Sequence, residues 1–239
     1  FNNTKVFPAR FSGRKSTGGK LEGLIIASPS NPTGTMILSD EMRILAKYCQ
    51  KQNIRLISDE IYHGITYNQR ATSALEFSED AIIVNSFSKY FSMTGWRLGW
   101  MVLPKSLTRS VECLAQNLFI SPPKLSQVAG IAAFDSIDYL DNHVANYRKN
   151  RDFLLDTLPK FGFHKLSRAD GAFYLYADVS HMTTDSEEFC QRCLMETGVA
   201  ITPGIDFDPY RGKYFARFSF AGPHEKIVEA VKRLGRWKN

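Results

Sequence analysis

Short apolar runs alternate with a helical pattern in the first part of the chain. Residues 23–27, 54–58 and 81–86 are apolar runs bounded by turn residues, which is typical of buried strands. Between the first two runs, a helical period begins at a predicted cap on Ser39 and continues to about Gln52. A strand, a helix and a second strand in this order predict a parallel sheet covered by helices.

The rest of the chain continues with a possible strand and then with helices. We expect a strand at residues 98–103, helices at about 107–119, 125–137 and 141–160, strands at 171–179 and 214–221, and helices at about 185–197 and 223–237. Predicted strands and helices are mixed beyond residue 145, which indicates a second, smaller layer. The predicted fold class is therefore α/β. A mostly parallel sheet covered by helices occupies a large domain at residues 1–144, and a smaller C-terminal α/β domain follows at residues 145–239.

Composition and charge exclude several classes of protein. The chain has 239 residues, of which 44% are hydrophobic, so it can bury an ordinary core. Its net charge of +6 is concentrated in the first 21 residues, which carry five basic side chains and no acidic one, and we interpret this segment as a solvated loop. The nearly neutral remainder argues against a nucleic-acid partner. No apolar run is long enough for a membrane span, and the four scattered cysteines favour the cytoplasm.

Two of the cysteines form a Cys-x-x-Cys pattern at Cys190 and Cys193, which requires a choice between metal chemistry and packing. Both lie on one apolar stripe of the helix predicted after Asp185, and no matching second ligand pair occurs. His63, near Asp59 and Glu60, likewise lacks a second ligand set. We therefore predict buried structural cysteines and no metal site.

Polar side chains follow each of the first three predicted strands. Asn31 follows the first strand and Asp59 the second, and Ser86, Ser88 and Lys89 follow the third. Because the carboxyl ends of parallel strands meet at one edge of a sheet, we expect these side chains to line one edge.

The residue types at this edge suggest a cofactor. A desolvated lysine such as Lys89 can form a Schiff base, and Asp59 can hold a protonated ring nitrogen. The hydroxyls of Ser86 and Ser88, together with the guanidinium of Arg97, can grip a phosphate. A lysine, a carboxylate and a phosphate grip together indicate pyridoxal 5′-phosphate.

Motifs along nearly the whole chain support this interpretation. They are Ser-Asn-Pro-Thr-Gly at 30–34, Ser-Asp-Glu-Ile-Tyr at 58–62, Ser-Phe-Ser-Lys at 86–89, Met-Thr-Gly-Trp-Arg-Leu-Gly at 93–99 and Ala-Arg-Phe-Ser-Phe-Ala at 216–221. In order and spacing they resemble the fold-type I pyridoxal-phosphate-dependent aminotransferases of class I/II, which include aspartate-aminotransferase-like enzymes.

The resemblance implies a role for each matching residue. Lys89 would hold the cofactor as a Schiff base and then shuttle a proton, while Asp59 would keep the pyridine nitrogen protonated. Tyr62 and Asn31 would donate to the cofactor's phenolic oxygen, and Arg217 would bind the substrate's α-carboxylate. The set is completed by the phosphate-binding residues Ser86, Ser88 and Arg97.

The resemblance also implies an activity and partners. We expect ping-pong transfer of an amino group between an L-amino acid and a 2-oxo acid, in a homodimer with shared active sites. The family's chain begins well before the point that matches Phe1, so we expect that a longer native chain or an associated fragment supplies the rest. Two alternatives remain open: another fold-type I pyridoxal enzyme, such as a C–S lyase or a synthase, and an aminotransferase-like effector domain of a transcription regulator.

Overall fold

The computed structural model describes residues 21–237, which form two compact units. The first unit contains residues 21–29 and 36–142, and the second contains residues 30–35 and 143–237. The predicted basic loop lies outside the described residues except for Leu21. No helix of the described part combines the length and the apolar character that a membrane crossing requires. The division into domains at residues 144 and 145 stays a prediction.

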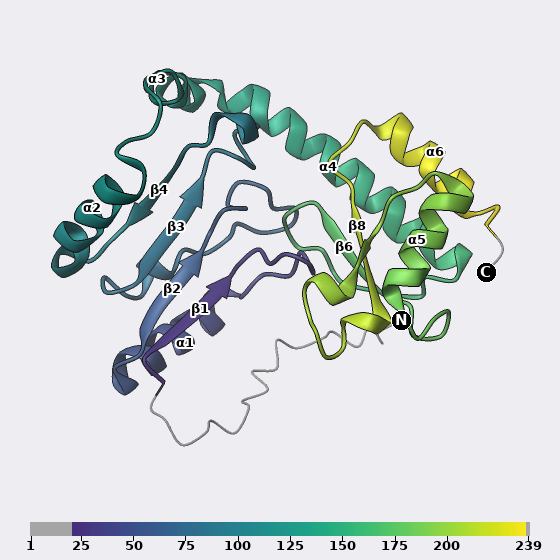
Figure 1. Ribbon diagram of the computed structural model, residues 1–239, viewed down its shortest axis with the longest axis horizontal. Helices are drawn as coiled ribbons and strands as arrows, with labels where there is room; N and C mark the ends of the chain where they lie inside the picture. The colour runs from purple at the N-terminus through teal and green to yellow at the C-terminus, as the bar shows by residue number, and fades with distance from the viewer. Residues whose placement is uncertain (1–20, 238–239) are drawn as a thin grey trace. The chain divides into compact units, whose positions relative to one another are not determined.

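The first unit is built on a four-stranded sheet in the order β1-β2-β3-β4 (Figure 1). Its strands are β1 (Gly23–Ala27), β2 (Arg55–Asp59), β3 (Ile82–Ser86) and β4 (Gly99–Val102). The pairs β1·β2 and β2·β3 are parallel, whereas β4 runs antiparallel to β3. The predicted strand–helix–strand unit and the mostly parallel sheet are therefore confirmed.

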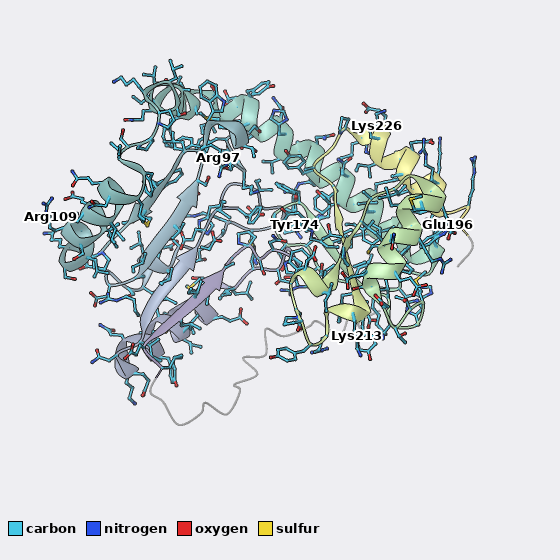
Figure 2. The ribbon with its side chains drawn as sticks, in the orientation of Figure 1. Arg97, Arg109, Tyr174, Glu196, Lys213 and Lys226 are labelled. Carbon is cyan, nitrogen blue, oxygen red and sulfur yellow. The ribbon has the colours of Figure 1, made fainter. Side chains whose placement is uncertain are left out.

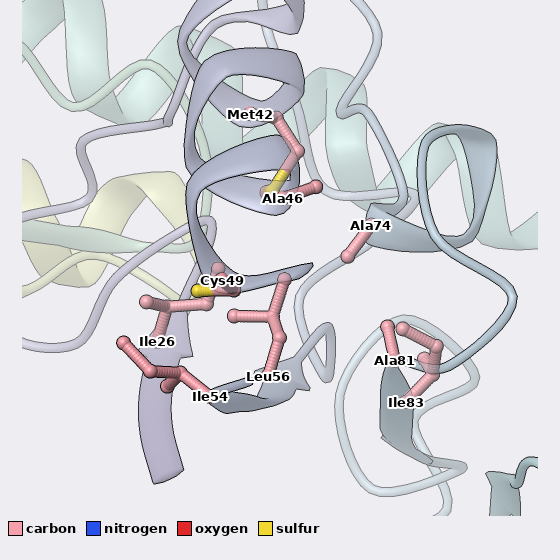
Figure 3. Close-up of a cluster of buried hydrophobic side chains, with 9 residues drawn as sticks. All are labelled: Ile26, Met42, Ala46, Cys49, Ile54, Leu56, Ala74, Ala81 and Ile83. Atoms are coloured by element: carbon pink, nitrogen blue, oxygen red, sulfur yellow. The ribbon is translucent and has the colours of Figure 1, made fainter. Parts of the chain in front are cut away.

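Helix α1 (Ser39–Gln52) covers one face of this sheet. Met42, Ala46 and Cys49 project from a single side of the helix because they lie three or four residues apart. They pack against sheet side chains that include Ile26 and Leu56 (Figure 3). The predicted cap at Ser39 is wrong: Ser39 is the first helical residue, and the backbone N–H of the preceding Leu38 donates to Glu41 Oε2 at 2.9 Å.

Three further helices follow β4. They are α2 (Lys105–Phe119), α3 (Lys124–Ala133) and α4 (Ile137–Thr157), and α4 continues from the first unit into the second. The helix predicted for about 125–137 ends earlier, and the one predicted from about Asp141 begins at Ile137 after a single 3₁₀ turn.

The second unit contains an antiparallel sheet in the order β5-β6-β8-β7. Its strands are β5 (Lys165–Leu166), β6 (Tyr174–Asp178), β7 (Thr202–Pro203) and β8 (Phe215–Ser219), and its remaining helices are α5 (Ser186–Thr197) and α6 (His224–Leu234). Asp185 caps α5 by accepting hydrogen bonds from the backbone N–H groups of Glu187 and Glu188. Cys190 and Cys193 lie buried on α5, as predicted.

A short turn at residues 30–35 belongs to the second unit, although the strand before it and the helix after it belong to the first. Gly171 N–H donates to Gly34 O at 2.8 Å, and Gly34 N–H donates to Ser30 O at 2.7 Å. Gly34 has a φ of +65°, which a glycine adopts without strain. The turn is thus fixed against the segment that leads into β6.

Candidate functional site

Six of the predicted site residues lie in the first unit, at or after the carboxyl ends of β2 and β3. They are Asp59, Tyr62, Ser86, Ser88, Lys89 and Arg97. Asn31 and Arg217 belong to the second unit and form their own cluster there.

Asp59 is the last residue of β2, and its neighbours in the sheet are Ala27 of β1 and Val84 of β3. Its Oδ1 accepts a hydrogen bond from Ile61 N–H at 3.1 Å, which starts the turn that follows the strand. Tyr62 in this turn is only 4% exposed. The parallel sheet therefore fixes the backbone of Asp59, and the turn fixes that of Tyr62.

Lys89 lies in a loop just after β3. The loop is closed at its base, because Phe87 N–H donates to Leu98 O at 3.1 Å and Met93 N–H donates to Phe87 O at 3.0 Å. The Lys89 Nζ lies 5.7 Å from the centroid of the Tyr62 ring. Among the described residues, no carboxylate lies within ion-pair distance of Lys89. Its amine is thus held near Tyr62 without a fixed counter-ion.

Tyr90, the next residue, anchors this loop on its other side. Its hydroxyl donates to Asp141 Oδ1 at 2.6 Å, and its ring packs so closely on Gly64 that a methyl group there would lie 2.6 Å from it. Partial burial and this hydrogen bond raise the pKa of Tyr90, so the hydroxyl remains a donor.

The predicted phosphate-binding residues gather around the start of β4. Ser88 N–H donates to Ser86 Oγ at 3.0 Å, and Ser86 Oγ lies within hydrogen-bond distance of both Ser88 Oγ and Leu98 O. Arg97 lies near the carboxyl end of β3, where Ser86 pairs with Gly99 (Figure 2). Its NH1 donates to Thr94 O at 2.9 Å, which leaves the rest of an exposed guanidinium available.

The cluster in the second unit is centred on Arg217, in the middle of β8. Arg217 pairs with Tyr176 of β6 on one side and Thr202 of β7 on the other. Its NH1 donates to Asn31 Oδ1 at 2.7 Å, and its NH2 donates to Thr202 Oγ1 at 3.2 Å. The Asn31 oxygen is therefore occupied, so the amide N–H₂ of Asn31 is the group that remains free to donate.

Aromatic rings hold the Arg217 guanidinium in place. Its central carbon lies 4.3 Å from the centroid of the Tyr174 ring and 4.7 Å from that of Phe207. Within residues 21–237 it has no carboxylate partner, and its buried Nε lacks a hydrogen-bond partner. A half-buried cation of this kind is a good binding group for an organic anion.

The turn after β2 also carries two interacting side chains, the buried Glu60 and the half-buried His63. Glu60 is 3% exposed, and its Oε2 lies 3.4 Å from His63 Nδ1. Burial lowers the pKa of His63, while the charge of Glu60 opposes this shift. The sequence pattern alone suggested no role for these two residues other than metal binding.

Sequence reasoning also missed the partners of Arg217. Tyr174, Thr202 and Phe207 carry no local signal of this role, because their contact with Arg217 depends on the order of the strands in the sheet. The alternation of β6 places Tyr174 and Tyr176 on one face, which was the available hint.

Comparison with known proteins identifies relatives over nearly the whole chain. The family model for aminotransferase class I and II matches residues 12–234. A valine–pyruvate aminotransferase of Mycobacterium tuberculosis is 50% identical over 91% of this chain and 57% of its own length. An aspartate aminotransferase of Sulfurisphaera tokodaii is 31% identical over 98% of this chain and 61% of its own length. The chain thus spans about three fifths of these relatives.

Solved structures agree with the sequence relatives. An aminotransferase from Mycobacterium tuberculosis superposes with a TM-score of 0.89 at 49% identity, covering 93% of this chain and 59% of that one. A tetra mutant of Thermus thermophilus aspartate aminotransferase superposes with a TM-score of 0.84 at 30% identity, covering 90% and 59%. On its sequence and its fold together, the chain belongs to the aminotransferase class I and II family.

Proposed function

We propose that the protein is a pyridoxal-phosphate-dependent aminotransferase that moves an amino group between an L-amino acid and a 2-oxo acid. The observation that carries this proposal is the Arg217 cluster. Its half-buried guanidinium has no carboxylate partner in the described part of the chain, and it is held by two rings, Asn31 and Thr202. An amino acid and a 2-oxo acid each carry a carboxylate next to the reacting carbon. A single fixed guanidinium can therefore bind both substrates of such a reaction.

The residues of the first unit fit the cofactor by their chemistry. Lys89 offers an amine that has no fixed counter-ion within residues 21–237, and Asp59 offers a carboxylate whose backbone the sheet holds. Ser86, Ser88 and Arg97 offer two hydroxyls and an exposed guanidinium to a phosphate. When bound, the cofactor supplies an aldehyde that takes up the amino group and a ring that accepts the electron pair left on the substrate's α-carbon.

The chain's own residues perform the remaining tasks. We infer that Lys89 is the covalent attachment point and moves the proton that leaves the α-carbon of the amino acid. Asp59 would accept the hydrogen bond of a protonated ring nitrogen, and Tyr62 and Asn31 would donate to the phenolic oxygen of the cofactor. Arg217 binds and orients the substrate carboxylate. Each role is a proposal that follows from the residue's chemistry and from the family.

An absorption experiment on the complete natural chain tests the function. We expect a visible band after addition of pyridoxal phosphate, loss of that band when an amino-acid substrate is added alone, and its return with a 2-oxo acid. A band that no amino acid changes would favour the regulator alternative. Irreversible release of a thiol or another fragment would favour the lyase alternative.

The relatives suggest which substrates to test first. One relative at 50% identity is named for valine and pyruvate, and another at 31% identity is named for aspartate. We propose valine with pyruvate as the first pair, because identity to the former is much higher. Comparison of kcat/KM for valine and aspartate at one pyruvate concentration decides between them.

We also infer a homodimer with shared active sites in the cytoplasm. Exposed apolar side chains on α2 and in the connection to α3 support an interface, and they include Leu118 at 75% and Ile120 at 83% exposure. Light scattering on the complete chain measures the assembly directly. The cytoplasmic location rests on the sequence alone and is checked by cell fractionation.

A further inference from the structure

The carboxylate of Glu60 is buried at the centre of the turn that carries Asp59 and Tyr62. Its Oε1 accepts hydrogen bonds from Ser73 Oγ at 3.1 Å and from Ala74 N–H at 2.9 Å. Among the described residues, neither lysine nor arginine lies within ion-pair distance of it. Burial of a carboxylate at 3% exposure destabilises the fold unless its oxygens accept hydrogen bonds. The contacts with Ser73, Ala74 and His63 are therefore what stabilises Glu60 at this position.

His63 faces an acceptor at each ring nitrogen. Its Nε2 lies 3.1 Å from Ser28 O, and because a carbonyl oxygen only accepts, Nε2–H is the donor. Its Nδ1 lies 3.4 Å from Glu60 Oε2. Arg70 and Glu76 are the other charged groups that influence the ring, and they act in opposite directions. His63 therefore joins the end of β1 to the buried carboxylate beyond the end of β2.

These contacts continue directly to Asp59. Ser28, whose carbonyl accepts from His63, donates its own N–H to Asp59 O at 3.2 Å. Glu60 N–H donates to Val84 O at 2.9 Å, and His63 N–H donates to Glu60 O at 2.9 Å. Residues 60–63 thus connect the end of β2 to the residue that follows β1 and to the middle of β3, with contacts on both sides of Tyr62.

We propose that Glu60 and His63 are positioning residues, which act through Asp59 and Tyr62 to set how the protein holds its cofactor. This inference rests on the proposed function. Neither residue touches the reacting atoms. Together they fix the backbone from which the Asp59 carboxylate and the Tyr62 hydroxyl project, and so they determine the affinity for pyridoxal phosphate and the environment of its ring.

Four variants of the complete natural chain test the proposal. Glu60→Ala and His63→Ala remove the contacts, whereas Glu60→Gln can keep them: its amide oxygen accepts from Ser73 and Ala74, and its amide N–H donates to Nδ1 of a neutral His63. Cys49→Ala, in the apolar core beneath α1, is the matched control that loses stability without touching this network.

Two measurements are made on each variant. Titration with pyridoxal phosphate, followed by the visible band, gives the cofactor affinity and the pH midpoint of the band. Hydrogen exchange of the protein without added cofactor gives the opening of the turn at residues 59–65. We expect both alanine variants at positions 60 and 63 to weaken affinity by at least about tenfold, to shift the midpoint and to speed exchange in this segment. Glu60→Gln should stay within about threefold of the natural protein, as should Cys49→Ala.

The outcomes separate the possible failures. Unchanged exchange at residues 59–65 in both alanine variants would overturn the proposed restraint. Faster exchange together with an unaltered cofactor affinity and an unaltered pH midpoint would show a purely structural role. An equal loss of cofactor affinity in Cys49→Ala would show that lower stability alone causes the effect. If the natural protein develops no band with pyridoxal phosphate, the proposed function fails first, and this proposal fails with it.

Discussion

Replacement of Gly34 by alanine is expected to destabilise the second unit by about 2–5 kcal/mol. A Cβ on Gly34 would lie 2.8 Å from Gly171 O, 2.9 Å from Tyr174 O and 3.0 Å from Ala169 Cα. All three are backbone atoms, so no change of rotamer relieves the contact. The φ of +65° adds about 1–2 kcal/mol for an L-residue, and the overpacking adds about 1–3 kcal/mol.

The same substitution is expected to disturb Asn31, because Gly34 closes the turn that presents it. Movement of this turn would lengthen the 2.7 Å contact between Asn31 Oδ1 and Arg217 NH1. We therefore expect the KM for the amino acid to rise together with the loss of stability.

Gly95→Ala is the matched control, because nothing lies within 4 Å of a Cβ at that position. Urea unfolding of both variants of the complete chain, followed by fluorescence, gives the change in the free energy of unfolding. Gly95→Ala should lie within about 0.5 kcal/mol of the natural protein. If Gly34→Ala also lies in that range, the backbone contacts described for the turn are wrong.

Three further predictions concern single side chains. Lys89→Ala should abolish covalent attachment of pyridoxal phosphate, measured as the mass added after borohydride reduction, while far-ultraviolet circular dichroism is unchanged; persistent labelling would mean that another lysine is used. Arg217→Lys should raise the KM for the amino acid about 10- to 100-fold, because an ammonium group cannot replace the planar fork that contacts Asn31 and Thr202; an unchanged KM would exclude Arg217 as the carboxylate-binding group. Burial raises the pKa of Cys190 to about 12, so its thiolate is scarce in the folded protein at pH 8, and iodoacetamide should alkylate Cys113 at least about 100-fold faster. The raised pKa of Cys190 contributes to the free energy of unfolding below the ordinary thiol pKa, and this contribution is lost as the pH rises toward 12. The free energy of unfolding should therefore fall more steeply above about pH 9 in the natural protein than in Cys190→Ala.

The sequence was sufficient for elements whose cause is local. Apolar runs bounded by turn residues marked β1, β2 and β3, although one face of β1 is open, with Ile25 73% exposed. The cap at Asp185 and the end of α5 at Gly198 followed from side-chain chemistry and from a residue that tolerates positive φ. The direction of β4 did not follow, since an apolar run has the same pattern in either orientation.

The contacts within the candidate site were less predictable, because they join residues that are far apart in the chain. Asn31 and Arg217 are separated by 186 positions, and no local pattern encodes their hydrogen bond. The sequence placed Asn31 with the strand-end residues of the first unit, but its side-chain oxygen is used by the second. The residue types of the site could be predicted from the sequence, and their roles came from the resemblance of the motifs to the family.

The position of Arg217 explains why an arginine on a strand suits a carboxylate shared by two substrates. A guanidinium on a mobile loop would lose several rotatable bonds of freedom each time an anion binds, at about 2 kcal/mol for an arginine side chain. At Arg217 the folding of the unit has already removed this freedom, since β8 lies between β6 and β7 and the planar group is flanked by Tyr174 and Phe207. Its contacts with Asn31 and Thr202 use two of its five N–H donors, and the exposed ones that remain keep a fixed direction. In the proposed reaction, a carboxylate that arrives first on an amino acid and then on a 2-oxo acid would therefore meet the same prepared group, and the differences between substrates would be read by other residues.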